Sequence, residues 1–273
     1  MFVRFPRDTT DDAIRVQHQA LRRLGLEGRA AMTFELGNNL RSVVESGIRL
    51  HHPEFDESQR RAAIAKRILG RELAELVGAK LGQGAAMSQE DFFEKITSAL
   101  DKAGIPFMVV GSLASSLHGN PRATQDADIV IRPDSQTLEI FLQQIGNEFY
   151  VAPETARHAL RTHSMFNVID TGSGWKVDLI IALATEFAEE AFARRLWAKV
   201  LGIDVAVQSP EDTILSKLSW GKDSGSELQY RDALSVAVEQ WEKLDQQYLR
   251  RWASELDVSD LLKRILEEAA RIA

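Results

Sequence analysis

Short apolar runs alternate with helical segments through the middle of the chain, and this alternation constrains the fold more than any other feature. Ile105–Val110 is a continuous apolar run that ends at Gly111, which is typical of a buried strand, whereas Asp126–Ile131 alternates acidic or small residues with isoleucine. Strands are predicted at 105–110, 126–131, 164–169, 176–181 and 205–208, and helices at 113–117 and 138–145. The middle of the chain is therefore predicted to be α/β.

Helical patterns flank this region on both sides. Apolar positions recur at helical spacing from Asp11 to about Val77, with a break marked by Gly25 and Gly28. The second of these helices is predicted to end at His51–Pro53. Further helix starts are indicated by the caps Asp56 and Ser88 and by Pro210.

The segment Gly82–Ala86 is the best linker candidate, because it is rich in small residues and lies between two helical patterns. Three domains are predicted on this basis. A helical accessory domain spans residues 1–85, an α/β core spans 86–209 and a C-terminal helical region spans 210–273.

Composition excludes several classes of protein. The 273 residues contain no cysteine, which rules out disulfides, thiolate zinc sites and cysteine nucleophiles. The net charge of −7 argues against a protein that coats nucleic acid through basic surface. No apolar stretch approaches the roughly 20 residues that a membrane span needs. We expect a cytoplasmic protein without membrane contact.

The turn after the first predicted strand is a candidate phosphate site. Gly111-Ser112 follows the strand directly and opens a helix, whose first N–H groups and positive dipole end attract anions. Gly111 allows a phosphate to approach the backbone, and the Ser112 hydroxyl can donate a further hydrogen bond. This pattern indicates a phosphate cradle.

Three aspartates on neighbouring predicted strands are candidate metal ligands. Asp126 and Asp128 point to the same face of their strand, and Asp178 interrupts an otherwise apolar strand. Clustered carboxylates repel each other unless a cation lies between them, and hard oxygen ligands select Mg²⁺ or Mn²⁺. Three carboxylates beside a phosphate cradle are what metal-assisted phosphoryl or nucleotidyl transfer requires.

Gly111-Ser112, Asp126-Ala127-Asp128 and Asp178, in this order, resemble the signature of the DNA polymerase beta-like nucleotidyltransferases. The segment Arg122-x-Thr124-x-Asp126-x-Asp128 is similar to the subgroup of AbiEii-type toxins of toxin–antitoxin and phage-defence systems. The resemblance covers about residues 90 to 245. It implies an α+β fold with a mixed sheet and flanking helices, preceded here by the N-terminal helical domain.

The resemblance also implies a mechanism, in which an NMP passes from an NTP to a hydroxyl and pyrophosphate is released. Asp126, Asp128 and Asp178 would hold two Mg²⁺ or Mn²⁺ ions, and Asp178 would help to deprotonate the acceptor. The nucleotide, ATP or GTP, would be bound by the residues of the cradle and its surroundings, which are Gly111, Ser112, Arg122, Thr124 and Lys217.

The partners implied by the resemblance are an NTP and a hydroxyl acceptor on RNA such as tRNA, on a protein or on a small molecule, together with an antitoxin protein. The negative net charge favours a small or locally docked acceptor over long nucleic acid. A non-catalytic nucleotide-binding or interaction module on the same fold is the main alternative. A glycosyltransferase is a weaker one, because Gly111-Ser112 has no place in its site.

Simpler interpretations remain open for individual residues. Asp178 alone is more often an acid at a strand edge than a ligand, and Lys217 could be a solvated side chain. Asp232 is expected to pair with Arg231 or Lys217. The histidines near the motifs, His118 and His163, are left out of the catalytic set.

Overall fold

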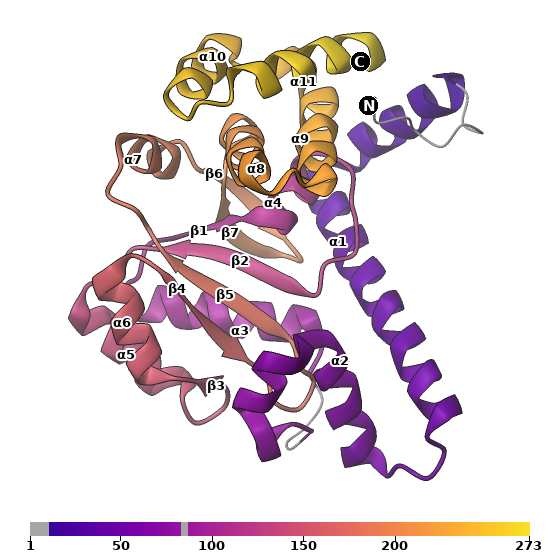
Figure 1. The fold of residues 1–273 in the computed structure, drawn as a ribbon, viewed down its shortest axis with the longest axis vertical. Coiled ribbons are helices and arrows are strands. Elements are labelled where there is room, and N and C mark those ends of the chain that lie inside the picture. Colours follow the sequence, from indigo (N-terminus) through magenta and orange to yellow (C-terminus); the bar gives the residue numbers. More distant parts are fainter. Residues whose placement is uncertain (1–10, 83–86) are drawn as a thin grey trace. The chain divides into compact units, whose positions relative to one another are not determined.

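We analysed the protein as a computed structural model, which describes residues 11–82 and 87–273. Most of the predicted linker, residues 83–86, lies outside the described residues. In Figure 1 the strands are drawn as arrows, and their colours show that they come from the middle and later parts of the chain. Within the described residues no helix is both long and apolar enough to cross a membrane.

The chain divides by its internal contacts into two compact units. Of the described residues, 11–33, 110–122 and 185–273 form the first unit, and 34–82, 87–109 and 123–184 form the second. Each unit is thus assembled from separated stretches of chain. The three domains expected from the sequence are continuous stretches of chain, whereas these units are defined by contacts. The domain boundaries therefore stay a prediction.

Five strands build the sheet of the second unit, in the order β3-β4-β5-β2-β1. Strands β2 and β5 run parallel, whereas β4 is antiparallel to both β5 and β3. The sheet is therefore mixed, as expected, and the predicted strands at 164–169 and 176–181 form an antiparallel hairpin, β4 and β5. The bounds are β1 Phe107–Val110, β2 Asp126–Ile131, β3 Tyr150–Val151, β4 Met165–Ile169 and β5 Lys176–Ile181.

Among the helices of the second unit, several begin at residues that cap their N-termini and have an apolar face that is buried in the unit. Asp56 and Ser88 cap their helices as predicted, and the buried Phe92, Phe93 and Ile96 lie on one of them. The helices are the later part of α1 (Asp11–His51), α2 (Glu57–Val77), α3 (Gln89–Lys102), α5 (Ser135–Ile145), α6 (Pro153–Thr162) and the short 3₁₀ helix η1 (Gly78–Lys80).

The N-terminal helices of the second unit share a core with its sheet. Leu69 and Val77 of α2 pack in one cluster with Ile169 of β4. The backbone N–H of Gly82 donates to the Thr171 carbonyl at 2.7 Å, and a side chain at Gly174 would collide with Ala65. The turn between β4 and β5 therefore packs against α2 and is hydrogen-bonded to Gly82, which follows α2.

The first unit contains a hairpin and a group of helices. Strands β6 (Leu196–Val200) and β7 (Ile203–Val207) are antiparallel. The helices are the early part of α1, α4 (Gly111–His118), α7 (Glu186–Ala193), α8 (Pro210–Ser224), α9 (Glu227–Glu239), α10 (Gln246–Glu255), α11 (Ser259–Ile272) and the short η2 (Trp241–Lys243). Figure 1 shows α8 to α11 grouped together, and a large apolar cluster connects them. Gly25 interrupts α1 with a φ of 66°, which is the break predicted there.

Several elements were not expected from the sequence. β6 pairs with β7 and buries Ala198 and Val200, but Leu196 and Trp197 are exposed, so its apolar residues do not alternate regularly with polar ones. β3 has only two residues. Helices α6 and α7 begin at Pro153 and after the cap Thr185, which are local signals that the sequence analysis did not use.

Candidate active site

The three predicted metal ligands lie on two neighbouring parallel strands of the second unit. The register of β2 and β5 places Asp128 opposite Asp178 and Asp126 opposite Lys176. Side chains alternate along each strand, so these four residues share one face of the sheet. We call Asp126, Asp128, Asp178 and Lys176 the carboxylate cluster.

Lys176 lies between two of the carboxylates. Its Nζ donates to Oδ2 of Asp178 at 2.7 Å and lies 3.3 Å from Oδ2 of Asp126. Its side chain is 17% exposed. Burial by itself lowers the pKa of Lys176, but the hydrogen bond and charge of Asp178, together with those of Asp126, outweigh burial and raise the pKa above its usual value. The ammonium is therefore charged at neutral pH.

Both oxygens of Asp178 already accept hydrogen bonds from side chains of this unit. Asn167 on β4 is the register partner of Asp178, and its Nδ2 donates to Oδ1 at 2.5 Å. Lys176 donates to the other oxygen. The Asp178 side chain is 10% exposed, so these two donors satisfy a nearly buried carboxylate.

Thr124 positions Asp126. The Thr124 hydroxyl lies 2.9 Å from the backbone oxygen of Asp126 and 3.3 Å from its Oδ1, and the Thr124 carbonyl accepts from Nε2 of the buried Gln89. The side chain of Thr124 is thus engaged with the start of β2. Its predicted contact with a triphosphate stays a prediction.

The carboxylate cluster has the donor chemistry for a hard divalent ion, since its ligands would all be carboxylate oxygens. A cation, the Lys176 ammonium, already lies among them. No ready-made group of three or more His, Asp or Glu side chains in metal-holding proximity occurs in residues 11–82 and 87–273. The cluster therefore suits a metal ion by the chemistry of its oxygens, while its side chains as placed are not arranged around an ion.

The predicted phosphate cradle belongs to the first unit. Gly111 opens α4 with a φ of 64°, in the left-handed region that favours glycine. Ser112 follows it, and its Oγ accepts a hydrogen bond from Nη2 of Arg122 at 2.5 Å. The strand-to-helix turn therefore has the local geometry that the sequence predicts.

Asp232 on α9 accepts hydrogen bonds from two cationic side chains of this unit. Arg122 donates to it through two nitrogens, from Nε to Oδ1 at 3.1 Å and from Nη2 to Oδ2 at 3.0 Å. Nζ of Lys217, on α8, donates to Oδ2 at 2.8 Å, and the Ser115 hydroxyl lies 3.3 Å from the same oxygen. We call Arg122, Lys217, Ser112, Ser115 and Asp232 the cationic cluster.

Burial decides two questions that the sequence left open. The Lys217 side chain is 3% exposed and that of Asp232 is 8% exposed, so Lys217 is not a solvated lysine. The expected pairing of Asp232 with Lys217 is confirmed, whereas Arg231 pairs with Glu227 at 2.8 Å. The cationic cluster is a hydrogen-bonded network in which Lys217 and Asp232 are nearly buried and the Arg122 side chain is 30% exposed.

His118 is the last residue of α4, the helix that begins at the phosphate cradle, and its side chain is buried. Burial is the main cause that lowers its pKa to about 4, and the hydrogen bond with the Gln208 carbonyl opposes this only in part. His118 is therefore neutral at pH 7 and donates from Nε2 to that carbonyl. This role is structural, in agreement with its omission from the catalytic set.

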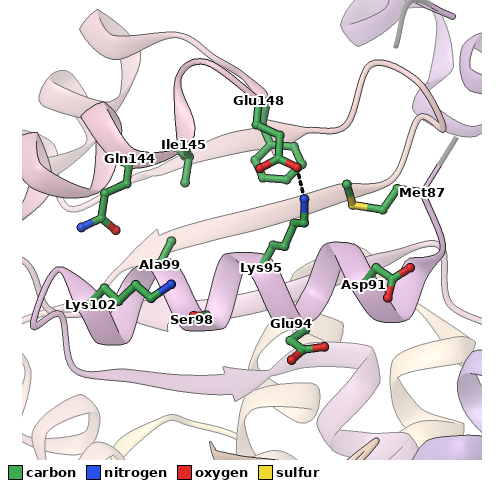
Figure 2. A pocket seen from close by; sticks show the side chains of 11 residues that line it. Met87, Asp91, Glu94, Lys95, Ser98, Ala99, Lys102, Gln144, Ile145 and Glu148 are labelled. Carbon is green, nitrogen blue, oxygen red and sulfur yellow. Dashed lines mark hydrogen bonds and ion pairs between the residues drawn. The ribbon is translucent and has the colours of Figure 1, made fainter. Parts of the chain in front are cut away.

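Two cavities, one in each unit, differ in their lining, because only that of the first unit contains a member of one of these clusters. One of about 470 Å³ in the first unit is lined by Lys217 together with Lys222, Tyr230 and Arg264. Another of about 790 Å³ in the second unit lies between α3 and the end of α5 (Figure 2), where Lys95 forms an ion pair with Glu148. No predicted site residue lines the second cavity, so only the first adjoins a site residue.

The structure thus gathers the predicted site residues into two clusters, one in each unit. Two cluster members, Lys176 and Ser115, were not predicted from the sequence, and neither was Asn167, which donates to Asp178. A signal existed for Lys176, because it lies two residues before Asp178 and so on the same face of a strand. Asn167 joins Asp178 only through the pairing of β4 with β5.

No family model matches the sequence, and no curated protein matches it. Among solved structures, the crystal structure of ANT(2'')-Ia in complex with adenylyl-2''-tobramycin is similar with a TM-score of 0.43 and 14% identity, over 63% of this chain and 98% of that one. The solution structure of ANT(2'')-Ia gives 0.39 and 19%, over 61% and 94%. A nucleotidyltransferase-like protein from Paracoccidioides brasiliensis gives 0.40 and 20%, over 63% and 91%.

Proposed function

We propose that the protein is a metal-dependent nucleotidyltransferase that moves an NMP from an NTP to a hydroxyl acceptor. The observation that carries this proposal is the register of β2 and β5, which puts Asp126, Asp128 and Asp178 on one face of adjacent strands. Carboxylates are rarely placed together in this way without a cation to hold, because their charges repel each other.

The proposed reaction assigns separate tasks to the residues of the carboxylate cluster. The acceptor oxygen forms a bond to the α-phosphorus, the bond from that phosphorus to the pyrophosphate oxygen breaks, and the acceptor proton passes to a carboxylate, for which Asp178 is the proposed group. Asp126 and Asp128 would hold the divalent ion together with Asp178. When bound, Mg²⁺ or Mn²⁺ neutralises phosphate charge and favours the ionised acceptor.

The cationic cluster is the proposed site for the β and γ phosphates. Carboxylate and phosphate oxygens attract the same donors, and the Asp232 carboxylate already accepts from Arg122 and Lys217. Ser112 and the free N–H groups at the start of α4 can donate to a phosphate as well. Arg122 and Lys217 would then stabilise the charge that develops on the leaving pyrophosphate.

The acceptor classes are a hydroxyl on RNA such as tRNA, on a protein or on a small molecule, and ATP or GTP is the proposed donor. The cavity beside Lys217 and Tyr230 offers space for a ligand group in the first unit. We place the reaction in the cytoplasm, because nucleoside triphosphates, the proposed donors, are present there.

A labelling experiment tests the proposal directly. The protein is incubated with each α-³²P-labelled NTP, Mg²⁺ and acceptors from three classes: total RNA, extract protein and a small polyol such as an aminoglycoside. We expect label in one acceptor class with the wild type and none with Asp126→Asn/Asp128→Asn. Absence of label with every NTP and acceptor, while nucleotide still binds without divalent metal, would refute transfer.

A toxin role is the finer proposal, and it is supported by the motif from Arg122 to Asp128. Induced expression in bacteria should arrest growth with the wild type and not with Asp126→Asn/Asp128→Asn, and a co-expressed neighbouring antitoxin protein should relieve the arrest. Growth arrest by both forms would refute a toxin role that depends on transfer.

One observation favours the non-catalytic alternative, in which the fold binds nucleotide or a partner. Both clusters already contain an internal counter-ion, Lys176 in one and Asp232 in the other. A scaffold could retain such ion pairs for stability. The labelling experiment separates the two proposals, because a scaffold binds nucleotide without transferring label.

A further inference from the structure

Lys176 has the position of a resident cation in the carboxylate cluster. It lies on β5 opposite Asp126 and two residues before Asp178, so the backbone of two paired strands holds its side chain on the face that carries all three carboxylates. Its Nζ is within hydrogen-bonding distance of Asp178 and within ion-pairing distance of Asp126.

A divalent ion at Asp178 would have to replace a donor that the structure already provides. One oxygen of Asp178 accepts from Asn167 and the other from Lys176. If an ion displaced the ammonium from Asp178, a side chain that is 17% exposed would lose its shorter contact and keep only the ion pair with the more exposed Asp126 at 3.3 Å. Removing a close partner from a largely buried charge is costly, so the lysine resists displacement.

The lysine also has an advantage over a dissolved ion. It is attached to the strand beside Asp178, so its binding to that carboxylate does not depend on the concentration of free metal. It further places a positive charge close to any ion bound between Asp126 and Asp178, and two like charges at that separation repel each other.

We propose that the Lys176 ammonium takes the place of one divalent ion at Asp178, so that the carboxylate cluster binds one ion fewer than its three carboxylates would otherwise hold. The inference rests on the proposed function, because it concerns the same metal site. It replaces the expected pair of ions by an ion and a lysine.

The test counts bound Mn²⁺ by equilibrium dialysis and by loss of the free Mn²⁺ signal in electron paramagnetic resonance. We compare the wild type with Lys176→Met, which keeps the length of the side chain and removes its charge. The variant is expected to bind one more Mn²⁺ per chain than the wild type. Adding Asp178→Asn to Lys176→Met should abolish that additional ion.

Lys176→Arg is the matched control, because it keeps a positive charge beside Asp178. It should bind as many ions as the wild type, and circular dichroism would establish that each variant is folded. Should Lys176→Met misfold, Lys176→Gln takes its place. Equal numbers of Mn²⁺ in wild type and both neutral variants overturn the inference, and so does an additional ion in Lys176→Arg.

Failure of this inference differs from failure of the proposed function. Label transfer together with equal Mn²⁺ numbers leaves the transferase intact and removes the role of Lys176. The expected difference in Mn²⁺ numbers without label transfer supports the role of Lys176 at a metal site and removes the transferase. Absence of bound Mn²⁺ in every form overturns both.

Discussion

The carboxylate cluster and the cationic cluster are neutralised in opposite ways. In the second unit, one lysine lies among three aspartates, whereas in the first unit, one aspartate lies among an arginine, a lysine and two serines. Each cluster therefore keeps an excess of the charge that its proposed ligand would neutralise, a divalent cation in one case and phosphate in the other. A protein can hold like charges together in this way before the ligand arrives.

The two clusters differ in burial, so substitutions in them should affect different properties of the protein. Lys217 and Asp232 are almost entirely buried, so when one of them is removed the other has little access to water. The Asp126 side chain is 43% exposed and is hydrated when its partners are removed. Changes in the carboxylate cluster should therefore affect chemistry first, and changes in the cationic cluster should affect folding first.

The largest effect is expected at the exposed carboxylate. Asp126→Asn should lower kcat/KM for NMP transfer about ten-thousandfold, or about 5 kcal/mol in the activation free energy, because an amide is a poor ligand for Mg²⁺. The measurement is label transfer at several NTP concentrations, and the melting temperature should change little.

Asp204→Asn is the matched control for Asp126→Asn. Asp204 also lies on a strand and pairs with a lysine, Lys199, at 3.0 Å, but both side chains are exposed. Transfer should be unchanged in this variant. An equal loss of transfer in the two variants would contradict the assignment of Asp126 to the site.

The next effect concerns the buried ion pair. Asp232→Ala should lower the free energy of unfolding by about 3 to 5 kcal/mol, since it leaves the Lys217 ammonium buried without its carboxylate. Urea unfolding measures the change. Combining Asp232→Leu with Lys217→Met should recover most of the stability, because the charge that remains without its carboxylate, on Arg122, is 30% exposed and can be hydrated.

Asp257→Ala provides the comparison for Asp232→Ala. Asp257 accepts from Lys222 at 2.5 Å on the exposed surface of the same unit. Its removal should leave the free energy of unfolding within experimental error. If the two alanine variants lose similar stability, the contrast between buried and exposed pairs is wrong.

The third effect is a pH dependence of the free energy of unfolding. It arises in the first unit, where α4 ends in the buried His118. Its folded pKa of about 4 lies below the ordinary value of 6.5, so the unfolded chain binds a proton more readily. The stabilising contribution is complete above pH 6.5 and is lost as the pH falls toward 4, by about 3 kcal/mol in total.

Unfolding in urea between pH 7 and pH 4 checks this prediction. His118→Gln should weaken the pH dependence, because glutamine keeps a donor for the Gln208 carbonyl and does not titrate. His158→Gln, at an exposed position, should leave it unchanged. Identical pH profiles for the wild type and His118→Gln would show that His118 is not the titrating group.

The smallest effect is the stability of the carboxylate cluster itself. Without metal, Lys176→Met should lower the free energy of unfolding by about 1 to 2 kcal/mol, because Asp178 loses one of its two donors and Asp126 loses a cation. Mn²⁺ should restore this stability, since it binds the folded form. Lys199→Met, at the exposed pair with Asp204, should show neither the loss nor the rescue.

Local sequence was sufficient for much of the fold. Asp56, Ser88 and Pro210 begin helices in the structure as their capping chemistry predicts, and His51 ends α1. Elements defined by pairing were harder to predict. β6 lacks a regular alternation of apolar and polar residues, because Leu196 and Trp197 are exposed while Ala198 and Val200 are buried, and its pairing with β7 defines it as a strand.

The candidate site divides in the same way. The alternation of β2 places Asp126 and Asp128 on one face, and a strand pattern places Asp178 on another strand, so the sequence alone named the three carboxylates. The spacing of Lys176 and Asp178 predicts that these two side chains share a face, but the contact of Lys176 with Asp126 was not predictable, because it depends on the parallel register of β2 and β5. Asn167 meets Asp178 only through the antiparallel register of β4 and β5.

The sequence by itself determined where strands and helices begin and which side chains share a strand face, because these properties depend on neighbours a few residues apart. The tertiary structure alone decided which charges meet. Arg122, Lys217 and Asp232 come from separate segments, and a nearly buried charge is stable only where folding brings a partner to it. Asp232 and Lys176 acquired their roles as internal counter-ions by that route.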